Sequence, residues 1–317
     1  TSYVHVTYPV WKQFGGQLDW LESFSAHVRA GIARTADRAA GAEETDRWGC
    51  RWIYPLEALD GVCTGHPLGD WDQLRRYHPP DPDQFTDWAA AGRGVAQAHA
   101  EGRPASGGTD HGFIFLRLTY LRGFDQCMLD IAAQDPRLLE LAALVESYWL
   151  EVVRRWVDLG VDSIGFGDDL GLQHALPISP AAWRQYIGPS YRRIFGYCRQ
   201  HGVHVALHSD GHILQIVPDL LALGVSVLNP QDLVNGLDNL ERLAKGRVFI
   251  NLDIDRQRIT VFGTPADCAA HVRQCVERLG SPRGGLSLIW GVYPGTPLAN
   301  IEAVARAMDE CASRWQP

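Results

Sequence analysis

VHVALHSDG at residues 203–211 is the segment that best indicates the architecture of this chain. It begins with an apolar run typical of a strand, and residues 213–221 after it favour a helix. The imidazole of His208 and the carboxylate of Asp210 therefore stand two residues apart at the end of a predicted strand. Because alternate side chains of an extended segment point the same way, we expect both to face one site.

The same alternation of strand and helix continues through the C-terminal two thirds of the chain. Strands are predicted at residues 161–166, 203–207, 225–228, 247–252 and 285–289, and helices at 138–159, 180–200, 213–221, 237–245, 265–280 and 298–314. Strands that are each followed by a helix imply a parallel sheet. The repeated spacing predicts an α/β fold of the (β/α)8 TIM-barrel type, with an open doubly wound sheet as the alternative.

The first hundred residues are less regular and predict a helical or irregular N-terminal elaboration together with the first barrel elements. Residues 46–52 are rich in aromatic side chains and are expected to form a strand or a lid, and residues 77–83 carry three prolines typical of an extended connector. Residues 113–118 are expected to form an early barrel strand. No clean boundary is visible, so residues 1–317 are predicted to be a single domain.

Composition excludes several classes of function. The net charge is −8 and the basic residues are scattered, which argues against a nucleic-acid partner. No segment approaches the run of about 20 apolar residues that spans a bilayer, and residues 1–17 lack the apolar core of a signal peptide. We therefore expect a cytoplasmic enzyme with no membrane partner.

Cysteine and lysine usage agrees with that expectation. Seven cysteines at irregular spacing do not suggest a disulfide framework. Cys268 and Cys275 are seven residues apart on a predicted helix and are expected to be small buried side chains. The two lysines, Lys12 and Lys245, show no sign of the buried environment that a Schiff base requires.

A second acidic pair, Asp168 and Asp169, ends the apolar run at residues 161–167. Adjacent side chains of a strand point to opposite sides, so at most one of the two should face the site. We favour Asp168, which shares parity with Phe166, while Asp169 would cap the following turn or contact substrate. Because TIM barrels place their active sites at the carboxyl ends of strands, His208, Asp210 and Asp168 are the predicted catalytic residues.

Further polar or aromatic residues near predicted strand ends are candidate substrate contacts, and each has a structural alternative. Arg117 would bind a substrate carboxylate or form an ion pair. Trp290 would wall a pocket or pack in the core, and Asp253 would contact substrate or cap a helix. The candidate substrate contacts are Asp169, Gln173, Asn229, Gln231, Asp253, Arg117, His111 and Trp290.

An ordered set of short motifs resembles the uroporphyrinogen decarboxylase superfamily. That group includes the decarboxylase of haem biosynthesis and zinc-dependent corrinoid or thiol methyltransferases. The resemblance covers nearly the whole chain and implies a TIM barrel, often dimeric, with its active site in the barrel mouth. The matching motifs are DRWG at 46–49, HPL at 66–68, YLRGF at 120–124, GVD at 160–162, DDLG at 168–171, SP at 179–180, HSDG at 208–211, VLNP at 227–230, NLD at 251–253 and TPLANI at 296–301.

Two departures from the family pattern bear on function. The resemblance implies an arginine-rich Arg-Gln-Ala-Gly-Arg clamp for substrate carboxylates near the N-terminus, but residues 8–16 read YPVWKQFGG, so a tetrapyrrole is not the expected substrate. The methyltransferases bind zinc through His-x-Cys and a distant Cys, whereas here Asp210 and the region of Trp290 occupy those positions. His208 and Asp210 would still suit a divalent metal such as zinc.

These observations predict an enzyme, with three alternatives for its function. The first is a decarboxylase, a lyase, that acts on a compact organic acid. The second is a metal-dependent methyltransferase that moves a methyl group to or from a thiol or corrinoid acceptor, in which case a corrinoid protein is a partner. The third is a relative that binds a small molecule without catalysis. A homodimer is expected from the resemblance.

Overall fold

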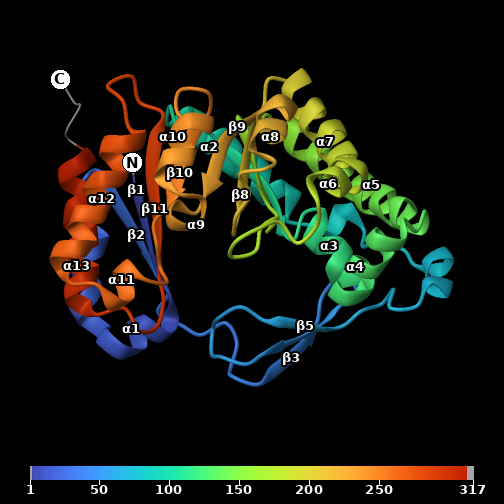
Figure 1. Ribbon diagram of the computed structural model, residues 1–317, viewed down its shortest axis with the longest axis horizontal. Coiled ribbons are helices and arrows are strands. Elements are labelled where there is room, and N and C mark those ends of the chain that lie inside the picture. Colours follow the sequence, from blue (N-terminus) through green and yellow to red (C-terminus); the bar gives the residue numbers. More distant parts are fainter. Residues whose placement is uncertain (1, 313–317) are drawn as a thin grey trace. The chain divides into compact units, whose positions relative to one another are not determined.

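The computed structural model describes residues 2–312, and these form two compact units. The first unit contains residues 2–43, 53–62 and 229–312, and the second contains residues 44–52 and 63–228. Eight strands belong to one sheet in the order β2-β1-β11-β10-β9-β8-β7-β6 (Figure 1). Neighbours in the sheet are neighbours in the chain, and the last strand pairs with the first. This is the strand order of a (β/α)8 TIM barrel, as predicted.

In the first unit, β1 (Ser2–Val6) lies between β2 (Val28–Ile32) and β11 (Leu286–Val292), and β11 also pairs with β10 (Phe249–Asp253). All three pairings are parallel. The last strand of the second unit, β9 (Val225–Pro230), ends at the boundary between the units. The helical elements of this unit are α1 (Tyr8–Phe14), η1 (Gly15–Ser23), α9 (Asp232–Asn235), α10 (Leu237–Leu243), α11 (Ile259–Phe262), α12 (Pro265–Leu279) and α13 (Leu298–Ala312).

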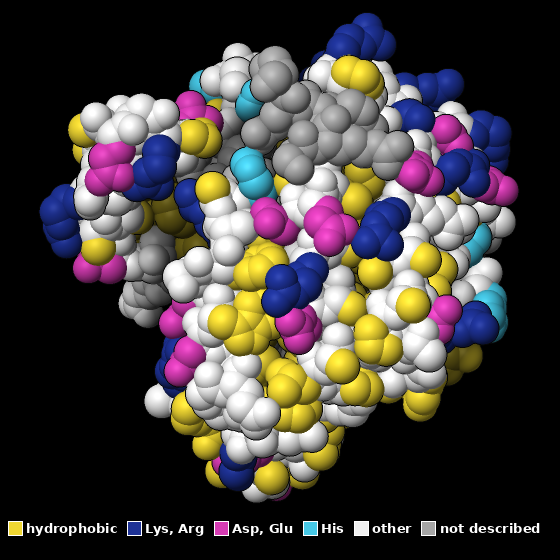
Figure 2. Space-filling view, turned by 90° about the vertical axis from the view of Figure 1, so that its left-hand side faces the viewer, with side chains coloured by type: hydrophobic (Ala, Val, Ile, Leu, Met, Phe, Trp, Pro, Cys, Tyr) yellow, Lys and Arg dark blue, Asp and Glu magenta, His cyan; other side chains and the backbone are white. Residues whose placement is uncertain are grey.

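Helices α12 and α13 pack against each other and bury one apolar face each. Helix α12 begins with a capping box in which Thr264 and Asp267 satisfy each other's backbone N–H groups. Figure 2 shows the side of the molecule that is at left in Figure 1, where basic and acidic side chains lie among hydrophobic ones. Arg273 of α12 and Glu310 of α13 form an exposed ion pair at 2.9 Å.

In the second unit, β7 (Ser163–Gly167) lies between β6 (Ser106–His111) and β8 (His204–Ser209), and both pairings are parallel. A separate three-stranded sheet has the order β3 (Ala42–Thr45), β4 (Arg51–Tyr54) and β5 (Val62–Gly65). The helical elements of this unit are η2 (Trp71–Arg76), η3 (Pro82–Gln84), α2 (Trp88–Ala100), α3 (Phe115–Arg122), α4 (Phe124–Ala133), α5 (Arg137–Asp158), α6 (Pro180–Tyr186), α7 (Gly188–Gln200) and α8 (Val217–Leu223).

The strand predicted at residues 113–118 is wrong, because this segment begins helix α3. The strand at this point of the fold is β6, whose sequence SGGTDH lacks the apolar run that signals a buried strand. The helix starts where it does because the buried carboxylate of Asp168 accepts its first backbone N–H groups. That contact spans more than 50 residues of sequence and leaves no local signal.

The helix predicted at residues 180–200 is present but is divided into α6 and α7. The division falls at Ile187, two residues before Pro189. Proline has no backbone N–H and its ring clashes with the preceding turn, so it is tolerated in the first turn of the new helix but not inside a continuous one. The predicted strands from residue 161 onward all appear, each within a few residues of its expected bounds.

An aromatic cluster forms much of the core of the second unit. Five ring pairs in this cluster have centroids 4.8–5.9 Å apart, in tilted, stacked or edge-on arrangements. They join Phe113, Phe166, Tyr191 and Phe195. All seven cysteines fall within the described residues and are free thiols, in agreement with the sequence. Among residues 2–312, no helix combines the length and apolar character needed to cross a membrane.

Candidate active site

Three neighbouring strands of the second unit bring two imidazoles to one place. His111 at the end of β6 and His208 near the end of β8 are both in register with Gly167 at the end of β7. Their ring centroids are 5.9 Å apart. Gly167 makes room for them, because a Cβ atom there would lie 2.8 Å from the ring of His111. A larger residue at the end of the middle strand would therefore push the two imidazoles apart.

Two carboxylates join these imidazoles. The nearest oxygen of Asp169 is 3.3 Å from Nε2 of His111 and 3.7 Å from Nε2 of His208. The nearest oxygen of Asp210 is 3.5 Å from the same Nε2 of His208. The backbone N–H of Asp210 also donates to Asp169 at 3.0 Å. We refer to His111, Asp169, His208 and Asp210 as the His–Asp cluster.

The His–Asp cluster is open to solvent but not fully exposed. The exposed fractions of its side chains are 51% for His111, 28% for Asp169, 28% for His208 and 33% for Asp210. Partial burial strengthens the electrostatic interactions while leaving the groups within reach of a small molecule. Titratable groups in such a setting at strand ends are typical of an active site in this fold.

Charge interactions within the cluster change the proton affinities of two members. Burial disfavours the charged form of His111, but Asp169 outweighs it and raises the pKa of the imidazole. Burial likewise disfavours the Asp169 carboxylate, but His111 outweighs it and lowers the pKa of that carboxyl. The pair therefore favours an imidazolium beside a carboxylate, which is a proton donor held next to a proton acceptor.

The expectation that Asp168 rather than Asp169 faces the site is corrected. Asp168 is fully buried, and its carboxylate accepts N–H groups from residues 114–116 and the hydroxyl of Tyr191 at 2.7–3.1 Å. The alternation along the strand persists: Asp168 continues the buried side of Ile164 and Phe166, which packs against helix α7, so Asp169 lies on the other, less buried side. Burial raises the pKa of Asp168, while the four donors act in the opposite direction. This carboxylate fastens helix α3 and Tyr191 to the end of β7, beneath the cluster.

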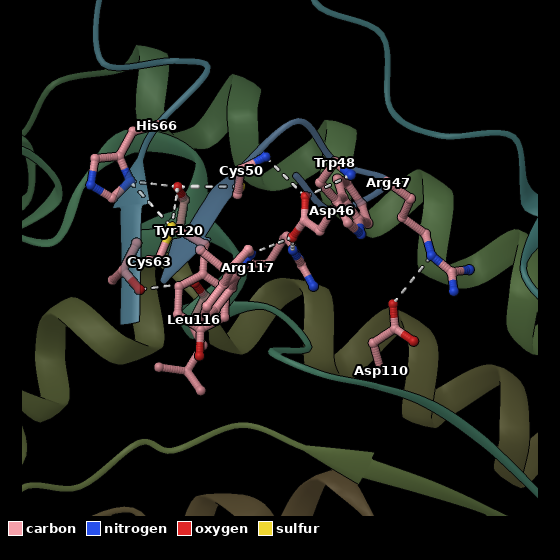
Figure 3. A network of polar contacts seen from close by, with 12 residues as sticks. Asp46, Arg47, Trp48, Cys50, Cys63, His66, Asp110, Leu116, Arg117 and Tyr120 are labelled. Atoms are coloured by element: carbon pink, nitrogen blue, oxygen red, sulfur yellow. Dashed lines mark hydrogen bonds and ion pairs between the residues drawn. The ribbon is translucent and has the colours of Figure 1, made fainter. Parts of the chain in front are cut away.

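The predicted role of Arg117 is also corrected in favour of its alternative, the ion pair. Its side chain is only 4% exposed and lies 3.4 Å from the carboxylate of Asp46 (Figure 3). Its guanidinium group covers the rings of Trp48 and Tyr120, at 4.6 and 5.5 Å from their centroids. A guanidinium enclosed in this way is not placed to hold a substrate carboxylate.

Sequence reasoning missed the network in which Arg117 takes part. Asp46 accepts hydrogen bonds from the backbone N–H groups of Trp48 and Cys50 and from the indole of Trp52, all at 2.9–3.0 Å (Figure 3). Nearby, Nδ1 of His66 and the thiols of Cys50 and Cys63 all contact the backbone oxygen of Tyr120. The spacing of Asp46, Trp48 and Cys50 in the sequence gives no recognisable signal that Asp46 is the acceptor of this network.

Gln173 lies exposed in the loop after Asp169. The remaining predicted site residues belong to the first unit. There the side-chain amide of Asn229 donates to the backbone oxygen of Asn251. Gln231 and Asp253 form an isolated parallel β-bridge, and the carboxylate of Asp253 forms an ion pair with Arg256 at 3.1 Å. Trp290 is fully buried, in agreement with core packing, which was the alternative to a pocket wall. The neighbouring Asp255 accepts backbone N–H groups from residues 258–260 and so caps helix α11.

The donor atoms of the His–Asp cluster suit a divalent metal ion. One ligand atom each of His111, Asp169 and His208 lies within 4.8 Å of the other two. Two imidazoles and a carboxylate fit zinc and several other divalent ions. The cluster contains no thiolate, so it differs from the His-x-Cys and distant Cys set that the family resemblance implies. His111, which was predicted only as a substrate contact, completes the set.

Comparisons with known proteins agree with this architecture. The chain is similar in structure to a methyltransferase from Methanosarcina mazei, with 18% identity, a TM-score of 0.57, and coverage of 83% of this chain and 76% of that one. It is also similar to an L-ribulose 3-epimerase (12% identity, TM-score 0.45, 79% of this chain and 92% of that one). A third similar structure is the 3-keto-D-glucoside 4-epimerase YcjR from E. coli (12% identity, TM-score 0.43, 72% of this chain and 87% of that one).

None of the curated proteins matches this sequence significantly. The sequence model of uroporphyrinogen decarboxylase (URO-D), in contrast, matches residues 49–311. That span contains all four residues of the His–Asp cluster and every described strand from β4 to β11. This chain therefore belongs to the uroporphyrinogen decarboxylase family.

Proposed function

We propose that this protein is a decarboxylase, and so a lyase, that acts on a compact organic acid. The observation that carries the proposal is the His–Asp cluster, in which two imidazoles and two carboxylates meet at the ends of three neighbouring strands. Membership of the URO-D family supports it.

The reaction needs a proton donor at the carbon that loses its carboxylate. The carbon–carbon bond to the carboxylate breaks, the electron pair stays on the remaining carbon, and a proton replaces the departing carbon dioxide. The proposed donor is His208, whose Nε2 lies 3.5 Å from the carboxylate of Asp210. General acid catalysis of this kind typically contributes about 10²–10⁴-fold to the rate.

The substrate carboxylate needs a cationic partner, and His111 suits that role better than Arg117. Its side chain is half exposed, and Asp169 favours its imidazolium form. Arg117 is enclosed by Trp48, Tyr120 and Asp46 and offers no comparable surface.

A compact substrate is proposed because an array of cations for many carboxylates is lacking near the N-terminus. Residues 8–16 form α1 and the start of η1, and their one basic side chain, Lys12, is paired with Glu57 at 2.8 Å. A tetrapyrrole with several carboxylates would meet little positive charge on this segment.

The proposal is tested by measuring carbon dioxide release from a panel of small hydroxy, keto and aromatic acids. Wild-type protein should turn over at least one of them. His208→Ala and Asp210→Asn should lower kcat by about 10²–10⁴-fold while far-ultraviolet circular dichroism stays unchanged. An acid that binds without turnover would instead favour the third alternative, a ligand-binding relative.

A second candidate, metal-dependent methyl transfer, is favoured by the convergence of three ligand atoms within 4.8 Å. His111, Asp169 and His208 would hold the ion, which when bound would act as a Lewis acid toward a thiol or corrinoid acceptor. Metal analysis of protein purified without chelator separates the two proposals. A metal content that falls by one divalent ion per chain between wild type and His111→Gln, together with methyl transfer to a thiol and no carbon dioxide release, would favour the second.

A further inference from the structure

A second group of metal-ligating side chains lies in the first unit, and neither proposed reaction uses it. Asp232 is the first residue of α9, and His271 and Cys275 lie on α12. All three side chains are buried, at 1%, 5% and 0% exposure. One ligand atom of each lies within 4.8 Å of the other two. We refer to these three residues as the Asp–His–Cys triad.

The spacing on helix α12 explains how two of the ligands meet. Residues four apart lie on one face of a helix, so His271 and Cys275 project to the same side. Two ligands at this spacing recur in helical zinc sites. The third ligand, Asp232, lies on α9. The backbone N–H of Asp255 donates to the Asp232 carboxylate at 3.0 Å and fixes the orientation of that carboxylate.

Two of the three interatomic distances are close to those around a tetrahedral ion. Sγ of Cys275 lies 3.7 Å from Nε2 of His271 and 3.9 Å from the nearest carboxylate oxygen of Asp232. With usual zinc bond lengths, a tetrahedral ion would set the sulfur about 3.6 Å from each of these atoms. The remaining distance, from the His271 nitrogen to the Asp232 oxygen, is 2.7 Å and is that of a hydrogen bond. An ion would replace this proton and separate the two atoms to about 3.4 Å.

The arrangement differs from a catalytic triad built around a cysteine. In such a triad the acid and the nucleophile contact opposite nitrogens of the imidazole. Here the sulfur and the carboxylate oxygen both approach Nε2 of His271. Because both atoms approach the same nitrogen, no proton can be relayed from one side of the ring to the other. A metal ion, in contrast, requires the sulfur, the nitrogen and the oxygen to lie close to one common point.

Charge also favours an ion at this position. A divalent ion would balance one thiolate and one carboxylate, and its binding would release protons. A pairing of soft sulfur with nitrogen and oxygen suits zinc rather than calcium or magnesium.

The surroundings offer both a route to the triad and space for a fourth ligand. His271 lines a groove of about 860 Å³ between α11 and α12, together with Phe262, which is 84% exposed, and Gln274. On the other side, Asp232 borders a cavity of about 10 Å³, enough for about one water molecule. Three protein ligands and a water complete a four-coordinate zinc site.

We propose that Asp232, His271 and Cys275 form a zinc site distinct from the His–Asp cluster. The site joins α9 to α12 and lies in the first unit, so its expected effect is on the stability of that unit rather than on the chemistry at His208. The proposal does not depend on the proposed function.

The test uses the full-length protein, stripped of metal and titrated with Co²⁺ as a spectroscopic probe for the Zn²⁺ site. A thiolate bound to Co²⁺ gives a near-ultraviolet charge-transfer band, which the His–Asp cluster cannot produce because it has no sulfur ligand. The band should appear in wild type and in His208→Ala. It should disappear in Cys275→Ser, which should also weaken Zn²⁺ binding by at least about 100-fold, since even an outer-shell change costs about 10–100-fold.

Cys268→Ser is the matched control. Cys268 lies on the same helix and is equally buried, but its thiol contacts the backbone oxygen of Ile259. This variant should keep the band and the Zn²⁺ affinity. If Cys275→Ser does not fold, Zn²⁺ should still raise the Tm of His208→Ala and not that of the double variant His208→Ala, His271→Gln. A wild-type protein without the band, or a band that persists in either triad variant, would overturn the proposal.

Discussion

Gly171 and Gly211 lie backbone against backbone, and this contact joins the two loops that carry Asp169 and Asp210. The N–H of Gly171 donates to the backbone oxygen of Asp210 at 3.3 Å, and Gly211 has a φ of +81°. A Cβ atom on either glycine would overlap the backbone of the opposite loop. The close approach therefore sets the spacing between the two carboxylates of the His–Asp cluster.

Gly211→Ala should force these loops apart and destabilise the protein by about 3 kcal/mol or more, because backbone strain and steric overlap add. Gly246→Ala is the control. Gly246 has a similar φ of +72° but open space around it, so its cost should be about 1–2 kcal/mol. Urea unfolding measures both. Equal losses in the two variants would mean that the contact between the loops has no energetic role.

Asp168 and Asp169 are adjacent but should respond differently to substitution. Asp168→Ala leaves four buried donors without an acceptor and should cost about 3–5 kcal/mol of folding stability. Asp169→Ala should cost about 1 kcal/mol, since its partners are partly solvated, but should abolish activity. Chemical denaturation combined with an activity assay distinguishes the two. A stable Asp168→Ala protein would contradict the anchoring role of this residue.

The pair formed by His111 and Asp169 should make stability depend on pH. The pKa of His111 is raised above 6.5, so its contribution is fully present below pH 6.5 and is lost as the pH rises through the folded-state pKa. The pKa of Asp169 is lowered below 3.8, so its contribution is present above pH 3.8 and is lost as the pH falls through the folded-state value. The pair should therefore stabilise the fold most in mildly acidic solution.

The difference in unfolding free energy between wild type and His111→Gln measures this effect. It should be larger at about pH 5.5 than at about pH 9, by no more than about 1 kcal/mol because His111 is half exposed. The opposite sign, with a larger difference in alkaline solution, would mean that His111 is neutral in the folded protein.

Cys63 should be the most reactive cysteine of the second unit. A hydrogen bond from Cys50 and the neighbouring His66 lower the pKa of Cys63 to about 7, and its side chain is partly exposed. Its alkylation by iodoacetamide, followed by mass spectrometry, should rise to half its maximum rate near that pH. Cys50→Ala should shift the midpoint toward the ordinary value of 9.0. An unchanged midpoint would exclude Cys50 as the cause.

Sequence patterns predicted the second half of the fold well because its strands are continuous apolar runs with a proline or glycine at the adjoining helix ends. The first strands were harder to find. β6 contains two glycines and no large apolar residue, while β1 and β2 each have only five residues. Their stability comes from pairing with strands that lie far away in the sequence, such as β1 with β11, and local patterns do not report such pairing.

The candidate site was predicted in part. His208 and Asp210 meet because they share one strand end, which the period of two indicates directly. The choice between Asp168 and Asp169 failed because alternation shows which residues share a side of the strand, but not which side packs against the helices. The position of His111 opposite Gly167 depends on register between strands, and the meeting of Asp232 with His271 and Cys275 depends on the packing of α9 against α12. These relations become visible only in three dimensions.

The central claim is that His208, within the His–Asp cluster, acts in catalysis. The most direct measurement compares kcat for carbon dioxide release, on an acid that wild type decarboxylates, between His208→Ala and His204→Ala. His204 lies on the same strand, is exposed, and pairs with β7 four residues away from His208. The account predicts a loss of about 10²–10⁴-fold for His208→Ala alone. Full activity in that variant, or an equal loss in His204→Ala, would contradict it.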